Sequence, residues 1–123
     1  MNAATAIRRL CAGWIAKDNG AIADLFAEQG VFIDPLHERP LVGAEDIRTT
    51  NQASVDELCD VSIDLYWVMG EGDRASAEGR MTATVVADGS RMDFEFVIVA
   101  ETSDGLITRL TEYFDTAPLT PSA

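Results

Sequence analysis

The stretch VFIDPLHERPLVG, residues 31–43, contains the most specific local pattern in this chain. Its apolar beginning, residues 31–33, predicts a strand, and the carboxylate of Asp34 follows the strand directly. The segment from Pro35 to Pro40 has a proline at each end and predicts an irregular loop. Asp34 is therefore either the cap of a turn, because Asp-Pro commonly starts turns, or a base at the mouth of a pocket.

Helical patterns lie on both sides of this stretch. An amphipathic helix that ends before Gly20 is predicted by apolar residues at helical spacing, namely Ile7, Leu10, Cys11, Trp14 and Ile15. A short second helix is expected over residues 22–26. A third is expected over residues 44–56, where Glu45 and Asp46 suit the first turn.

The second half of the chain has the pattern of an antiparallel meander. The short glycine-containing turns GEGD, ADGS and SDG separate four predicted strands, at residues 61–69, 75–86, 91–102 and 106–115. Three helices would cover one face of this sheet, which is an α+β layout. We expect a single domain over residues 1–117 and a flexible tail over residues 118–123.

Alternation along the predicted strands leaves apolar side chains on both faces of the sheet. Met92 and Phe94 point to one side of their strand, whereas Val97 and Val99 point to the other. One layer of helices cannot cover both faces. We therefore expect a homodimer that forms through the outer sheet face.

Composition excludes several classes of protein. The formal net charge of -12 over 123 residues argues against nucleic acid and anionic membranes as partners. No apolar run approaches the roughly 20 residues that span a bilayer, and no signal peptide is recognisable, so a cytoplasmic protein is expected. One histidine and two cysteines without a CxxC pair do not suggest a metal site, and no cofactor motif is present.

The order of elements resembles a known superfamily. The match rests on WIAKDNGAIADLFAEQGVFIDPLHERPLVGAEDIR, residues 14–48, and on DGLITRLTEYFD, residues 104–115. These stretches resemble the nuclear transport factor 2-like superfamily, and more narrowly its SnoaL-like cyclases, ketosteroid isomerases and limonene epoxide hydrolases. The resemblance covers residues 5–117. It implies a cone-shaped curved antiparallel sheet, wrapped by three N-terminal helices around an apolar pocket, as in the cystatin-like fold.

The ketosteroid isomerases provide the closest local resemblance. Leu25-Phe26-Ala27 precedes the Asp-Pro pair at that family's spacing, which implies that Asp34 is a general base moving a proton between carbons. The family's two oxyanion donors fall at Leu10 and near Val97, and neither side chain can donate a hydrogen bond.

The epoxide hydrolases provide a second resemblance. Tyr113-Phe114-Asp115 is similar to the end of that family's last strand, and Arg80 falls at its arginine. The family's second aspartate falls at Thr82, and its water-binding tyrosine and asparagine fall at Phe32 and Asp34. Arg80 and Asp115 are thus either a catalytic pair or a structural ion pair, with Glu78 as a possible third member.

These observations predict a hydrophobic pocket rimmed by the candidate catalytic residues Asp34, Arg80 and Asp115. Ligand contacts are expected from Trp14, Phe26, Phe32, Tyr66, Glu78 and Tyr113. His37, in its loop, is expected on the surface. The preferred hypothesis is a cofactor-free isomerase or SnoaL-type cyclase acting on a small hydrophobic substrate. The alternatives are an epoxide hydrolase-like enzyme that uses Arg80 and Asp115, or a non-catalytic module for ligand binding or interaction.

Overall fold

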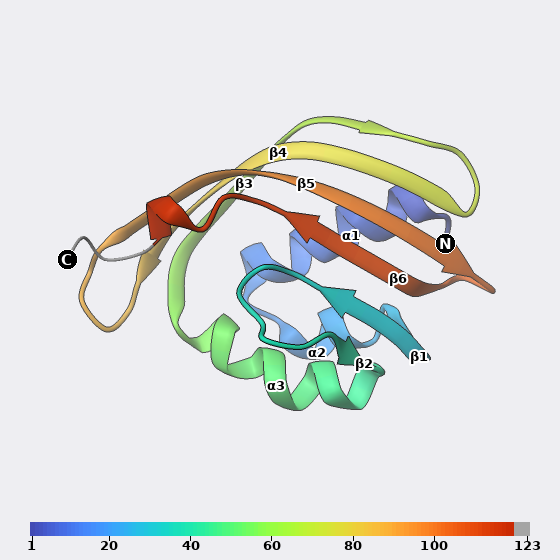
Figure 1. Cartoon of the computed structure of the whole chain (residues 1–123), viewed down its shortest axis with the longest axis horizontal. Helices are drawn as coiled ribbons and strands as arrows, with labels where there is room; N and C mark the ends of the chain where they lie inside the picture. Colours follow the sequence, from blue (N-terminus) through green and yellow to red (C-terminus); the bar gives the residue numbers. More distant parts are fainter. Residues whose placement is uncertain (120–123) are drawn as a thin grey trace.

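The computed structural model describes residues 1–119, in which helices lie within the concave side of a curved sheet (Figure 1). The end of the tail that was expected to be flexible, residues 120–123, lies outside the described residues. Three helices precede the long strands, namely α1 (Ala3–Ala16), α2 (Asn19–Ala23) and α3 (Ala44–Asp56), and a 3-10 turn, η1 (Ala117–Leu119), follows them. All three predicted helices are therefore present.

Helix α1 follows the predicted amphipathic pattern. The side chains of Ile7, Leu10 and Cys11 are buried along one face. The Asn2 side chain accepts a hydrogen bond from the Thr5 backbone N–H at 2.8 Å and caps the helix. The helix ends before Gly20, at Lys17, which adopts the left-handed conformation with φ 55°.

The sheet has six strands in the order β2-β1-β6-β5-β4-β3. Their bounds are Phe26–Ile33 (β1), Leu41–Val42 (β2), Leu58–Met69 (β3), Arg74–Val85 (β4), Arg91–Ser103 (β5) and Leu106–Tyr113 (β6). The predicted meander is confirmed as β3 to β6. Strand β2 was not predicted, and β1 pairs in parallel with β6, so the sheet is mixed and mostly antiparallel.

The prediction that the second helix extends to residue 26 was wrong. Strand β1 begins at Phe26, which pairs with Ile107 of β6 before the register shifts and resumes at Val31. Pairing with a distant strand thus outweighs the helical pattern of this short segment, as tertiary contacts commonly do. After the shift, the side chain of Phe32 is buried in the core, and Asp34 comes directly after the end of the strand.

The concave face of the sheet packs on α1, which contacts β3, β4 and β5 (Figure 1). Strand β4 presents small side chains to this helix, and Ala75, Ala77 and Ala83 are buried. Strand β5 presents large ones, and Phe94 and Phe96 are buried. Small residues under the helix and large residues beside it leave room for a cavity along part of the concave face.

The outer face of the sheet remains partly apolar. Exposed large side chains there include Tyr66, Trp67, Val99 and Tyr113. The homodimer therefore stays a prediction, made for this face. Within the described residues, no helix has the length and hydropathy needed to cross a membrane.

Candidate functional site

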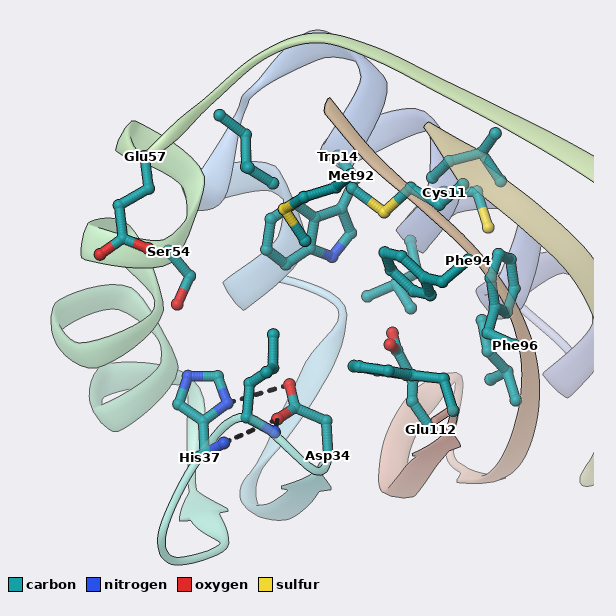
Figure 2. A pocket seen from close by; sticks show the side chains of 17 residues that line it. Cys11, Trp14, Asp34, His37, Ser54, Glu57, Met92, Phe94, Phe96 and Glu112 are labelled. Atoms are coloured by element: carbon teal, nitrogen blue, oxygen red, sulfur yellow. Dashed lines mark hydrogen bonds and ion pairs between the residues drawn. The ribbon is translucent and has the colours of Figure 1, made fainter. Parts of the chain in front are cut away.

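A cavity of about 350 Å³ lies between α1, the last turn of α3 and the concave face of the sheet (Figure 2). Its walls are mostly apolar, including the rings of Trp14, Phe94, Phe96 and Phe114. Besides the Cys11 thiol, five polar side chains also line it, namely Asp34, His37, Ser54, Glu57 and Glu112. A mostly apolar pocket with a few convergent polar groups is typical of small-molecule sites.

Asp34 lies directly after β1, and its side chain is only 7% exposed. Its Oδ1 accepts hydrogen bonds from the backbone N–H groups of Leu36 and His37, at 2.8 and 2.9 Å. Its Oδ2 lies 2.9 Å from Nδ1 of His37. Asp34 therefore caps the turn and also lines the cavity, so the two roles considered from the sequence are compatible.

His37 was expected on the surface, and this expectation was wrong, because its side chain is only 12% exposed. Its ring lies edge-on to Phe32, with 6.0 Å between the ring centroids. The hydrogen bond to Asp34 raises the pKa of His37 above the usual 6.5, although burial acts in the opposite direction. Asp34 and His37 thus form a hydrogen-bonded acid–base pair at one end of the cavity.

The loop that carries His37 is fixed at its far end as well. Asp46, in the first turn of α3, accepts hydrogen bonds from the Arg39 guanidinium at 2.7 and 2.9 Å. It also accepts one from the Val42 backbone N–H at 2.9 Å. The hydrogen bond with Arg39 is the main reason why the pKa of Asp46 is lowered. Both ends of the loop are therefore held, which restricts the position of His37.

Glu112, on β6, points its carboxyl group into the cavity beneath Phe94. Figure 2 shows Glu112 and Asp34 lining the same side of the cavity. Loss of hydration raises the pKa of Glu112 to about 8, with a smaller contribution from the negative charge of Asp34. Within the described part of the chain, no hydrogen bond or ion pair involves this carboxyl. At neutral pH it is mainly a protonated acid that faces the cavity.

Tyr113 was expected in the pocket, and strict alternation then places its neighbour Glu112 on the opposite face, so the sequence did not identify Glu112. Ile107 and Leu110 are both fully buried although they differ in parity. A register shift between β5 and β6, next to the Thr102–Ile107 pair, accounts for this difference. After the shift, Glu112 and Phe114 face the cavity and Tyr113 faces away. The apolar Leu110 and Phe114 were the sequence signal for this assignment.

Arg80 and Asp115 do not rim this cavity, which corrects the predicted geometry. They lie in a shallow outer depression that Asp93 and Glu95 also line. The Arg80 guanidinium forms its ion pair with Asp93, through Nε at 2.7 Å, and both side chains are about half exposed. The structure therefore separates Asp34 from Arg80 and Asp115. A functional role for Arg80 and Asp115 remains a prediction.

The predicted ligand contacts divide in the same way. Trp14 lines the cavity. Phe26 and Phe32 are buried in the core behind it, with 5.8 Å between their ring centroids. Tyr66, Glu78 and Tyr113 lie on the outer side of the sheet, where 57% of Tyr113 is exposed.

Two further cavity residues bear on its chemistry. Cys11 lines the cavity, and burial raises the pKa of its thiol to about 12, so the reactive thiolate is scarce. Leu10, where the resemblance to ketosteroid isomerases placed a hydrogen-bond donor, lines the cavity with an apolar side chain. Among residues 1–119, no group of three or more His, Cys, Asp or Glu side chains could hold a metal ion.

Solved structures with the same fold are numerous but distant in sequence. A putative isomerase from Bacillus subtilis is 22% identical, with a TM-score of 0.83 and coverage of 94% of this chain and 88% of that one. A protein of ketosteroid isomerase-like fold from Catenulispora acidiphila DSM 44928, in complex with trimethylamine, is 17% identical. It has a TM-score of 0.82 and coverage of 92% and 87%.

An epoxide hydrolase from M. tuberculosis, of the limonene epoxide hydrolase-like type, is 16% identical, with a TM-score of 0.76 and coverage of 91% and 81%. At these identities the likeness shows the fold alone, which hosts several reactions. A search of curated proteins found no match. The model of the SnoaL-like domain matches residues 7–110, and the chain therefore belongs to the SnoaL-like family, with the nuclear transport factor 2-like fold.

Proposed function

We propose that this protein is a cofactor-free isomerase or cyclase of the ketosteroid isomerase or SnoaL type. Its substrate would be a small hydrophobic carbonyl compound that binds in the cavity of about 350 Å³. Membership of the SnoaL-like family supports this class of chemistry, because the fold is shared by isomerases, cyclases and hydrolases.

The observation that carries the proposal is the presence of a proton-accepting pair and a proton-donating carboxyl group in one apolar cavity. The Asp34–His37 pair supplies a site that can accept a proton. The carboxyl of Glu112, whose pKa is raised to about 8, supplies a site that can donate one. A proton acceptor and a proton donor that share one apolar cavity are suited to the roles of general base and general acid.

The proposed reaction follows from these two groups. The Asp34–His37 pair removes a proton from the carbon next to the substrate carbonyl, and the electron pair moves onto the carbonyl oxygen. Glu112 donates a hydrogen bond or a proton to that oxygen, which takes the place of the donors absent at Leu10 and Val97. Return of the proton to another carbon completes an isomerisation. Attack of the same carbon on a second carbonyl completes a cyclisation.

The two acid–base groups predict how kcat/KM depends on pH. The basic partner must be unprotonated, so activity should rise through a pKa above 6.5, since Asp34 raises that of His37. The acid partner must be protonated, so activity should fall as Glu112 ionises near pH 8. A narrow bell-shaped profile of kcat/KM with these two limbs is expected.

The experiment is a screen of hydrophobic enolisable ketones, aldol substrates and epoxides with wild type and matched variants. Asp34→Asn and Glu112→Gln should each reduce kcat/KM by about 10²-fold or more. Asp115→Asn and Arg80→Ala, on the outer face, are the controls and should retain activity. Ligand binding without turnover would indicate a non-catalytic binding module. Loss of activity in Asp115→Asn and Arg80→Ala but not in Asp34→Asn or Glu112→Gln would refute the proposed site.

A further inference from the structure

One buried polar atom of the site has no partner. Nε2 of His37 is inaccessible to solvent and forms no hydrogen bond with any described residue. The other ring nitrogen, Nδ1, is 2.9 Å from Asp34, whose carboxylate accepts its proton. This bond places the proton of a neutral imidazole on Nδ1 and leaves a lone pair on Nε2. A buried lone pair of this kind requires a donor or a function.

Asp34 itself is a poor direct acceptor for a substrate proton. Its two oxygens already accept three hydrogen bonds, from the backbone N–H groups of Leu36 and His37 and from Nδ1 of His37. These three donors occupy most of the lone pairs that the Asp34 carboxylate could offer to a substrate proton. The available basic atom of the pair is therefore Nε2 of His37.

Ser54 is the one residue with a hydroxyl group among the described residues that line this cavity. It belongs to the last turn of α3 and lines the cavity together with His37. In Figure 2 its hydroxyl points from the helix toward the His37 ring. A serine hydroxyl can rotate to donate its hydrogen to a nearby acceptor while its oxygen remains free to accept another. Hydrogen bonds between catalytic groups are often long before the substrate binds.

We propose that Asp34, His37 and Ser54 form a proton relay. The Ser54 hydroxyl contacts the substrate, and His37 receives the hydroxyl proton. The Ser54 oxygen takes the substrate proton while its own proton moves to Nε2 of His37. The substrate keeps the electron pair as an enolate, and the charged imidazole is stabilised by Asp34. The reverse transfer returns the proton to the substrate and restores all three residues. Asp34 is then a positioning residue, unlike the aspartate base of the ketosteroid isomerases.

This inference rests on the proposed function for its chemistry, but its first test needs no substrate. His37 is the single histidine of the chain, so ¹⁵N NMR of its ring can be assigned without ambiguity. We expect the neutral ring to carry its proton on Nδ1. Nε2 has no partner in the ligand-free protein, so Ser54→Ala should shift its resonance only when a non-reacting ketone fills the cavity and the Ser54 hydroxyl donates to Nε2. Ser62→Ala, at an exposed position of β3, should leave that resonance unchanged.

The second test uses any substrate found in the screen. Ser54→Ala and His37→Gln should each lower kcat by about 10²-fold with little change in KM, and Ser54→Thr should restore part of the loss. A neutral ring with its proton on Nε2, or an Nε2 resonance that Ser54→Ala leaves unchanged with a ketone bound, would overturn the relay. Turnover that requires Asp34 but not Ser54 would overturn it and leave the proposed function standing. If NMR confirms the hydrogen bonds among Asp34, His37 and Ser54 but no substrate of the screen turns over, both the relay and the proposed function are refuted.

Discussion

Replacement of Glu112 by glutamine tests the electrostatics of the cavity without knowledge of the substrate. The amide has nearly the same shape as the protonated acid but cannot ionise. In the folded protein the pKa of Glu112 is raised to about 8 from its ordinary value of 4.5, a difference of about 3.5 pH units. Each unit corresponds to about 1.4 kcal/mol, so ionisation opposes folding by at most about 5 kcal/mol.

The sign of the pH dependence follows from proton binding. Below pH 4.5 both the folded and the unfolded chain hold the proton, and the stability associated with neutral Glu112 is fully present. Between pH 4.5 and about 8 only the folded chain holds it, so the free energy of unfolding falls as the pH rises. Above about 8 the full difference has been lost. Glu112→Gln avoids this loss, so its advantage over wild type should grow across that range.

The assay is urea denaturation followed by circular dichroism at pH 4.5, 6, 7 and 8.5. The variant and wild type should differ little at the lowest pH, and the variant should be more stable by about 3 kcal/mol at pH 7. Glu28→Gln, at an exposed position of β1, is the control and should show no such trend. A stability difference between Glu112→Gln and wild type that stays constant over this pH range would show that the Glu112 carboxyl is not held protonated by the cavity.

Three further predictions concern other parts of the molecule. Iodoacetamide at pH 8 should alkylate the partly exposed Cys59 much faster than Cys11, whose thiol has its pKa raised to about 12, as mass spectrometry of the intact protein can measure. Replacing Asp93 by asparagine should leave the urea midpoint of unfolding nearly unchanged, because its ion pair with Arg80 is exposed to solvent, and a clear fall of the midpoint would contradict this view. Sedimentation at micromolar concentration should detect a dimer that Tyr113→Arg weakens, and a monomeric wild type would refute the prediction for the outer face.

Much of the fold follows from local patterns in the sequence. Turn residues separate β3, β4, β5 and β6 close to the predicted positions, because glycine and aspartate favour tight hairpins wherever they occur. The bounds of α3 match the predicted helix over residues 44–56. The parallel pairing of β1 with β6 was not predictable in this way, because it joins segments far apart in the chain.

Sequence and tertiary structure determined different parts of the candidate site. The sequence alone indicated Asp34, because an acid that follows an apolar strand is a local feature. The tertiary structure alone placed Glu112 in the cavity, because a register shift against β5 reverses the faces that simple alternation assigns. It also buried His37, since the loop that carries it is held by Asp34 at one end and by Asp46 at the other. Residue type and spacing determine which groups are available, whereas contacts between distant segments determine which of them share a cavity and lose their water.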